Sequence, residues 1–257
     1  MTGYRTWLIE PPGYIHIQAL AELRDSLDAS LKDIDLYDEQ GAVIILGAHL
    51  HKMIGRMMTT PADIIFNTEV HGSPWFTKPY LDLLANHQVW DYSTENIEWL
   101  EKQGIDAEHC PIGYHPCLER IQRAGKQDID VLFYGSMTPR REAIWKEVCA
   151  IPDIEAVHLF GIYGAERDAL IVRSKIVLDL KAYDQSPRND VRLSYLWANN
   201  IYALREEEYT LEGLSVAGAI SVLLKWRPQL LHEAACWNGD AFRQHLQADY
   251  LRPLLMG

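Results

Sequence analysis

The segment DVLFYGSMTPRR, residues 130–141, combines the residue types that bind phosphate groups. An apolar strand ends in Gly135 and Ser136, and a short turn then leads to a helix with Arg140 and Arg141 in its first turn. Arginine is unfavourable there unless an anion binds, because a helix N-terminus already carries about half a positive charge. Glycine permits close backbone approach, and guanidinium groups match phosphate oxygens. The segment therefore predicts a diphosphate site; the alternative is a tight turn with two solvated arginines.

More polar clusters follow predicted strands in the second half of the chain. They are Gly161–Gly164, Lys181–Asp184, and a loop that places Asn189, Asp190 and Arg192 at the start of a helix. Ligands of open parallel sheets bind outside the carboxyl ends of the strands, so several such clusters on one edge indicate a ligand such as a nucleoside diphosphate. Taken alone, Asn and Asp at a helix start are also ordinary N-cap residues.

Strand ends in the first half offer groups for proton transfer. The loop EPPGYIH, residues 10–16, places His16 at the start of a helix, where the helix dipole disfavours the charged imidazolium and favours a neutral base. Glu69 and Asp91 follow two further strands, and either could orient His16 or act as the base itself. A structural histidine and a helix-capping aspartate are the alternatives.

These residues need a scaffold of alternating strands and helices. Apolar runs predict strands at residues 6–9, 43–46, 64–66, 88–92, 110–113, 131–134, 157–160, 176–180 and 201–204. Helical periodicity predicts helices at residues 15–31, 94–103, 140–150, 165–173, 191–198 and 240–255. Repeated β-α-β units imply parallel sheets flanked by helices. We expect an α/β protein with two Rossmann-like, doubly wound domains facing a cleft, at residues 1–114 and 129–257, joined by a linker at 115–128.

The composition is that of an acidic globular protein. The 257 residues carry a net charge of −12, which argues against a general nucleic-acid binder, because such proteins need basic surface to displace counterions. The four cysteines fit no zinc pattern, and His49 and His51 lack a third ligand at metal-site spacing, so we expect no metal site. The N-terminus is unlike a secretion signal, and no apolar stretch is long enough to span a bilayer. We therefore expect a cytoplasmic protein.

Seven blocks of the sequence occur in the order and spacing of a known enzyme group. They are EPPGYIH (10–16), IIFNTE (64–69), VWDYSTEN (89–96), PIGYHP (111–116), DVLFYGSMTPRR (130–141), RSKIVL (173–178) and RLSYLWAN (192–199). In these blocks the chain resembles the two-domain glycosyltransferases of the GT-B fold, and most closely their bacterial and phage branch related to the spore-coat maturation protein CgeB. The resemblance extends over nearly the whole chain.

The resemblance implies transfer of a hexose or pentose from a nucleoside diphosphate sugar, expected to be a UDP-sugar, to a hydroxyl acceptor. It implies no metal or other cofactor, since positive side chains and helix N-termini neutralise the leaving diphosphate in that fold. The acceptor stays open among small molecules, glycans, proteins and modified DNA bases, and the chain could form a homo-oligomer. Two alternatives remain: a phage-type transferase acting on modified DNA bases, and a sugar-nucleotide-binding protein without catalysis.

The residues and the resemblance together give each candidate a role. The expected donor-binding residues are Gly13, Gly135, Ser136, Arg140, Arg141 and Lys175, with Tyr183, Asn189, Asp190 and Arg192 at the sugar or ribose. The expected catalytic residues are His16 as the base and Glu69 or Asp91 as its orienter or as the base itself. The family often has a glutamate where this chain has Asn189 and Asp190, so the identity of the donor sugar is left open.

Overall fold

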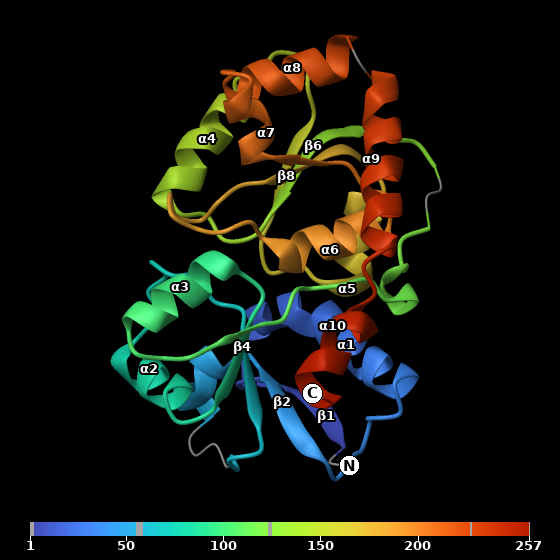
Figure 1. Ribbon diagram of the computed structural model, residues 1–257. Coiled ribbons are helices and arrows are strands. Elements are labelled where there is room, and N and C mark those ends of the chain that lie inside the picture. Colours follow the sequence, from blue (N-terminus) through green and yellow to red (C-terminus); the bar gives the residue numbers. More distant parts are fainter. Residues whose placement is uncertain (1–2, 55–58, 123–124, 227, 257) are drawn as a thin grey trace. The chain divides into compact units, whose positions relative to one another are not determined.

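The computed structural model describes residues 3–54, 59–122, 125–226 and 228–256, and these form two parallel β-sheets (Figure 1). By packing, the chain divides into two compact units. Unit 1 comprises residues 1–118, 185–191 and 245–257, and unit 2 comprises residues 119–184 and 192–244. The protein is therefore an α/β protein with two Rossmann-like parallel sheets, as the alternation in the sequence predicts.

Unit 1 is built on a sheet of five parallel strands. They are β1 (Tyr4–Leu8), β2 (Ala42–Leu46), β3 (Ile64–Asn67), β4 (Gln88–Asp91) and β5 (Glu108–His109). The register pairs Thr6 with Ile44 across β1 and β2. The strand order β1-β2-β3-β4-β5 follows the chain without a reversal, so the described strands of this sheet do not have the doubly wound order that we expected.

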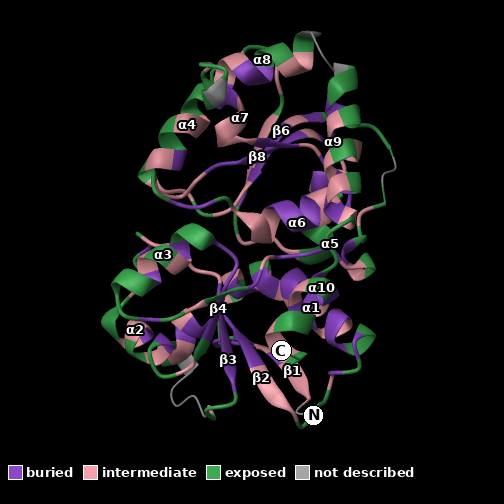
Figure 2. Ribbon diagram, viewed as in Figure 1, coloured by how far each residue is buried: buried purple, intermediate pink, exposed green. Residues whose placement is uncertain are grey.

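Helices cover this sheet and complete its core. They are η1 (Ile15–Leu20), α1 (Ala21–Asp33), η2 (Ala48–Ile54), α2 (Lys78–Leu84), α3 (Thr94–Lys102), η3 (Pro116–Leu118) and α10 (Gln247–Met256). Strand β3 is buried along its whole length (Figure 2), and α10 lies beside α1 (Figure 1). The side chain of Gln247 accepts a hydrogen bond from the Gly113 N–H at 2.6 Å, and the Gln247 N–H donates to Tyr114 O at 2.9 Å. Helix α10 is therefore an integral part of unit 1.

Unit 2 has four parallel strands with helices on both faces. The strands are β6 (Ile129–Tyr134), β7 (Ala156–Leu159), β8 (Ser174–Asp179) and β9 (Ala203–Arg205). The helices are α4 (Pro139–Cys149), α5 (Gly164–Ile171), α6 (Asp190–Ala198, whose first two residues count to unit 1), α7 (Glu206–Leu211), α8 (Val216–Trp226) and α9 (Pro228–Arg243). Val131 and Phe133 of β6 pack toward Val148 of α4, whereas Leu132 packs toward Ile171 of α5. The order β7-β6-β8-β9 reverses at β6, which is the doubly wound arrangement.

Two predicted elements differ from the structure. The segment 110–113 is not a strand: the short β5 precedes it, and the Cys110 N–H donates to Asp91 O at 2.9 Å. The predicted helix at 240–255 is split between α9 and α10, because His245 O accepts from the Tyr114 N–H at 2.7 Å in place of a helical bond. The predicted second domain also included residues 185–191 and 245–257, which pack with unit 1.

The apolar stretch at residues 213–224, which is too short to span a bilayer, lies largely in α8. Helix α8 packs against α4 and α9, and Ile220 of α8 is buried in the unit 2 core. Within the described part of the chain, every helix is too short or too polar to cross a membrane.

Candidate functional site

Gly135 ends β6 beside the point where the strand order of unit 2 reverses, which is where ligands bind in doubly wound sheets. Its φ is +133°, a conformation that favours glycine, and its N–H donates to Leu159 O at 3.0 Å. A Cβ on Gly135 would lie 3.0 Å from Nη2 of Arg192. The backbone conformation therefore favours glycine here, and a larger side chain would also displace the Arg192 guanidinium.

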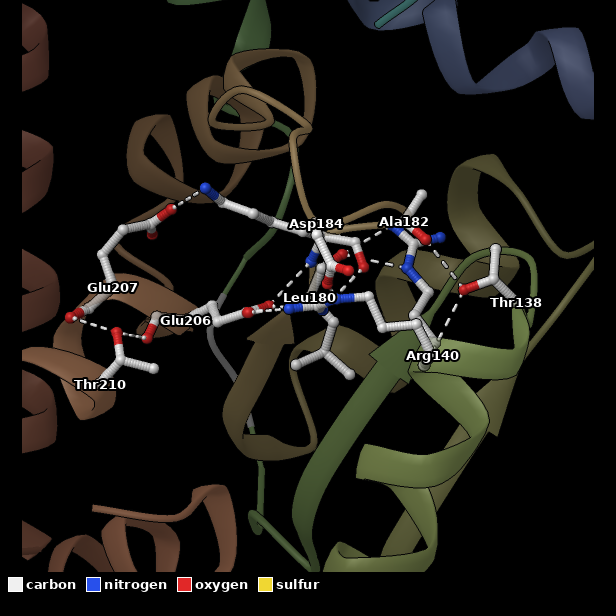
Figure 3. Close-up of polar contacts among 10 residues, drawn as sticks. Thr138, Arg140, Leu180, Ala182, Asp184, Glu206, Glu207 and Thr210 are labelled. Carbon is white, nitrogen blue, oxygen red and sulfur yellow. Dashed lines mark hydrogen bonds and ion pairs between the residues drawn. The ribbon is translucent and has the colours of Figure 1, made fainter. Parts of the chain in front are cut away.

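The loop after Gly135 leads to the capped N-terminus of α4. Thr138 is the N-cap: its Oγ1 accepts from the Arg141 N–H at 3.3 Å and donates to Ala182 O at 3.1 Å (Figure 3). Ser136 is exposed, and neither its N–H nor that of Met137 has an acceptor among the described residues. Two backbone donors and a helix N-terminus thus lie together at the carboxyl end of β6, which suits an anion.

Arg141 lies beneath this loop and is only 6% exposed. Its guanidinium donates to Leu180 O at 2.6 Å and to Ser136 O at 3.0 Å. Burial, and then the nearby Arg192, lower the pKa of Arg141 to about 10, so it stays charged at neutral pH. We expected Arg141 to bind phosphate directly, and this is corrected. Its guanidinium donates to backbone carbonyls, so it contributes positive charge beneath the loop.

Arg192 is the second buried guanidinium. Its Nη1 donates to Asp179 Oδ1 at 2.8 Å and its Nη2 to Tyr134 O at 2.8 Å, and both side chains of the Arg192–Asp179 pair are less than a tenth exposed. Burial raises the pKa of Asp179, and Arg192 opposes that shift. Arg141 and Arg192 together outnumber the carboxylate of Asp179, so this edge of the sheet carries buried positive charge.

Arg140, unlike Arg141, is partly exposed and lies in a network of ion pairs (Figure 3). It donates to Asp184 Oδ1 at 2.5 Å and to both carboxylate oxygens of Glu206, and Glu206 raises its pKa most. Lys181 contacts Glu207 at 3.0 Å in the same network. An anionic ligand would therefore have to replace carboxylates to contact Arg140.

The other expected donor-site residues are dispersed. Tyr183 lies half-buried in the loop after β8, on the same edge as Gly135. Asp190 pairs with Arg188, and Asn189 belongs to the pocket of unit 1. Gly13 lies in an exposed turn after β1, with φ +77°.

The expected place of Lys175 in the diphosphate site is wrong. It is the second residue of β8 and pairs with Asp130, near the start of β6, at 2.6 Å. That is the amino end of the sheet, and Gly135 lies five residues further along β6, or about 16 Å at the usual rise of a strand. Lys175 cannot bind the same phosphate as Gly135.

Unit 1 has a pocket of about 190 Å³ at the carboxyl ends of its first three strands. The lining residues are Tyr14, His16, Ile17, Ala19, Leu20, His49, Thr68, Glu69, Asn189 and Val191. The structure thus brings together two of the three expected catalytic residues, His16 and Glu69.

Glu69 contacts His49 in this pocket. Oε1 of Glu69 lies 3.3 Å from Nε2 of His49, and Oε2 accepts from the Ser73 hydroxyl at 3.0 Å. Burial lowers the pKa of His49 to about 4, with a smaller effect from His51, and raises the pKa of Glu69 to about 7 against the Ser73 hydrogen bond. The histidine is therefore neutral at pH 7, whereas the carboxyl group changes charge near that pH.

His49 is the site residue that sequence reasoning missed. In the sequence its spacing suggests only a metal ligand together with His51, but the ring of His51 contacts Ala48 O at 3.0 Å, and no cluster of three metal-ligating side chains occurs among the described residues. The available signal was that His49 follows the buried β2 as His16 follows β1. Aromatic rings surround it: Trp75 packs 5.2 Å from the His49 ring and 6.1 Å from that of Tyr14.

Asp91 does not belong to this pocket. It is fully buried, and it accepts hydrogen bonds from Asn67 Nδ2 at 2.5 Å, the Ser93 N–H at 2.8 Å and Asn96 Nδ2 at 3.3 Å. Burial raises its pKa to about 7 even though all three donors lower it. Its role as base or orienter is thus corrected: Asp91 joins the end of β4 to the start of α3.

Comparison with known proteins does not extend this description. No family model matches the chain, and no curated protein is significantly similar to it.

Proposed function

We propose that this protein is a glycosyltransferase that moves a sugar from a nucleoside diphosphate sugar to a hydroxyl acceptor. The observation that supports the proposal best is the buried charge under Gly135. Arg192 is paired with Asp179, and the buried Arg141 donates to backbone carbonyls, next to a loop in which the Ser136 and Met137 N–H groups have no acceptor among the described residues. A fixed positive charge at the switch point of a doubly wound sheet suits a diphosphate.

Sugar transfer needs that charge because negative charge develops on the diphosphate as the glycosidic bond breaks. Donors and charges that are already in place stabilise the leaving group without reorganisation. In this proposal the N–H groups of Ser136 and Met137 bind the diphosphate, and the buried charges of Arg141 and Arg192 stabilise it electrostatically. Arg140 binds the diphosphate after its ion pair with Glu206 or Asp184 breaks. Tyr183 contacts the sugar or ribose, and the GT-B fold of the resembled family is part of the same proposal.

Thermal-shift titrations with UDP, ADP, GDP and their sugars test the donor site. We expect at least one diphosphate to raise the melting temperature, since a ligand at about 100 times its Kd stabilises the native state by about 2.7 kcal/mol. The matching nucleoside should have little effect, because it lacks the diphosphate. Transfer should then be seen by release of the nucleoside diphosphate in the presence of EDTA. No response to any nucleoside diphosphate would sink the proposal.

The two alternatives separate in the same experiments. Donor binding without transfer to any acceptor or to water would favour a non-catalytic binding protein. A DNA-modifying transferase would retard hydroxylated DNA in a gel, with binding that weakens steeply as salt rises.

A further inference from the structure

The unit 1 pocket is lined without any lysine or arginine among the described residues. One part of its lining is apolar, with Ile17, Leu20 and Val191, and the rest is polar, with Thr68 and Asn189 among others. A mixed lining without fixed cations suits a neutral ligand that has an apolar face and hydroxyl groups. The volume of about 190 Å³ is below the roughly 300–1,000 Å³ of pockets for drug-sized ligands, so it suits a single ring.

His49 is a pocket histidine that contacts a carboxylate. Glu69 lies 3.3 Å from Nε2 of His49, and the His49 side chain is 6% exposed. The other ring nitrogen, Nδ1, has no hydrogen-bond partner in the part of the chain that the structure describes. A base that is held by a carboxylate through one nitrogen and has its other nitrogen available is the arrangement that general-base catalysis requires.

We propose that this pocket is the acceptor site for a small neutral hydroxyl compound, such as a sugar or polyol, and that His49, positioned by Glu69, is its general base. The inference rests on the proposed function, which supplies the sugar donor. It assigns the proton transfer to His49 in place of His16, which lines the same pocket next to Tyr14.

The proposed transfer moves one proton from the acceptor and one electron pair to the leaving group. The acceptor hydroxyl gives its proton to Nδ1 of His49, and its oxygen forms the new bond to C1 of the donor sugar. The bond from C1 to the diphosphate oxygen breaks, and its electron pair leaves on the nucleoside diphosphate. Glu69, as the carboxylate, stabilises the imidazolium until it releases its proton to solvent.

Burial keeps His49 neutral at pH 7, which leaves a lone pair on its ring but also weakens it as a base. The Glu69 carboxylate, which forms as the pH rises through about 7, opposes that weakening because it stabilises the imidazolium. The other titratable side chains near the pair are Tyr14, His16, His51 and Tyr80. We therefore expect the transfer rate to rise through pH 7, and Glu69→Gln to remove that rise.

The first experiment needs no donor. Histidine side-chain NMR signals would be followed while glucose, galactose or myo-inositol is added, with glucose 6-phosphate as the charged counterpart. We expect a neutral probe to shift the His49 signal and to leave that of the exposed His109 in place. Absence of a shift with every neutral probe, or an equal shift with glucose 6-phosphate, would overturn the acceptor class.

The second experiment measures transfer in variants whose UDP thermal shift is unchanged. His49→Gln should lose about 100-fold or more in kcat, as expected for loss of a general base. Glu69→Gln should reduce kcat by a smaller factor, and its transfer rate should no longer rise through pH 7. His109→Gln should have the kcat of the wild type. If His16→Gln loses transfer and His49→Gln retains it, the assignment to His49 is wrong. If the wild-type protein neither binds a nucleoside diphosphate nor transfers sugar, the proposed function fails instead. The NMR result then still shows whether the unit 1 pocket binds a neutral hydroxyl compound.

Discussion

The two units place different chemistry at the same edge of a parallel sheet. In unit 2 the carboxyl ends of the strands are lined by guanidinium groups, two of them buried. In unit 1 the same edge has a pocket with histidines and one carboxylate and, among the described residues, no lysine or arginine. One edge has charge that is permanent near neutral pH, and the other has groups that lose or gain charge there.

Burial acts on both edges, and the intrinsic pKa of each side chain decides the result. Burial lowers the pKa of Arg141 to about 10, which leaves the group charged at pH 7. It lowers the pKa of His49 to about 4 and raises that of Glu69 to about 7, which removes charge from one group and makes the other titrate. Similar desolvation thus leaves a guanidinium charged at pH 7 in one unit, and a neutral histidine beside a carboxyl group that titrates near pH 7 in the other.

The largest effect should come from removing the carboxylate that pairs with Arg192. Asp179→Asn leaves the buried Arg192 without its ion-pair partner and removes a negative charge that also attracts Arg141, and breaking a buried ion pair costs about 3–5 kcal/mol. We expect that loss in the free energy of unfolding of unit 2, measured at pH 7 by urea unfolding followed through amide hydrogen exchange of β6 and β8. Glu142→Gln, in an exposed pair with Lys146, should cost only about 0.3–0.5 kcal/mol. Equal losses in the two variants would show that the charge under Gly135 is not held as described.

Gly135→Ala should have the next largest effect. The new Cβ would require φ of +133° from alanine and would meet the Arg192 guanidinium, which together should cost about 1–3 kcal/mol and weaken nucleoside diphosphate binding. Gly213→Ala is the matched control, since its φ is +69° but nothing lies within 4 Å of the added Cβ. Calorimetric titration with UDP should separate the two: if both variants bind UDP like the wild type, Gly135 has no part in the site.

The pH dependence of stability should change in opposite directions in two unit 1 variants. The folded state retains a proton on Glu69 between about pH 4.5 and 7, so this group lowers stability as the pH rises. For His49 the unfolded state binds the extra proton between about pH 4 and 6.5, so this group raises stability over that range. From pH 4.5 to 6.5, Glu69→Gln should therefore make the slope more positive and His49→Gln more negative, each by up to about 1.4 kcal/mol per pH unit. Urea unfolding followed by the NMR signals of unit 1 measures both slopes, and a change of the same sign in both would contradict the assignment.

The smallest effect should come from the exposed part of the unit 2 edge. Glu206→Gln releases Arg140 for a ligand and should tighten UDP binding about twofold to fivefold, since partly exposed pairs contribute about 0.2–1 kcal/mol. Arg140→Gln should weaken it. Lys175→Gln removes the same charge at the opposite edge and should leave the UDP affinity unchanged; a comparable loss in both would contradict the correction made for Lys175.

The sequence predicts the sheets better than their ends. Apolar runs such as 64–66 and 131–134 identify β3 and β6, because a strand covered on both faces needs continuous apolar residues. The break between α9 and α10 is not visible as periodicity, since it depends on hydrogen bonds between residues 114 and 245–247 that lie far apart in the chain. Nor does local pattern show the strand order, which follows the chain in one sheet and reverses in the other.

For the site too, the sequence predicts the features that are local in the chain and not those that depend on contacts between distant segments. Gly135 and Thr138 could be placed because a strand, a turn and a helix start are contiguous in the chain. The pairing of Glu69 with His49 could not, because it depends on how two loops after different strands meet. Lys175 could have been excluded beforehand: it precedes the apolar run of its own strand, so it had to lie at the amino end.

The place of α10 in unit 1 has a consequence for the order in which the protein is made. The strands of unit 1 end at residue 109, but residues 245–257, which close its core beside α1, follow unit 2 in the chain. At about 5–20 residues per second, a ribosome needs roughly 7–27 s to synthesise the chain between them. During that interval Gln247 is absent, and the Gly113 and Tyr114 backbone groups that it will engage are left to water. The unit that begins first is therefore completed last, and the face of α1 that α10 covers stays exposed until residues 247–256 have been made.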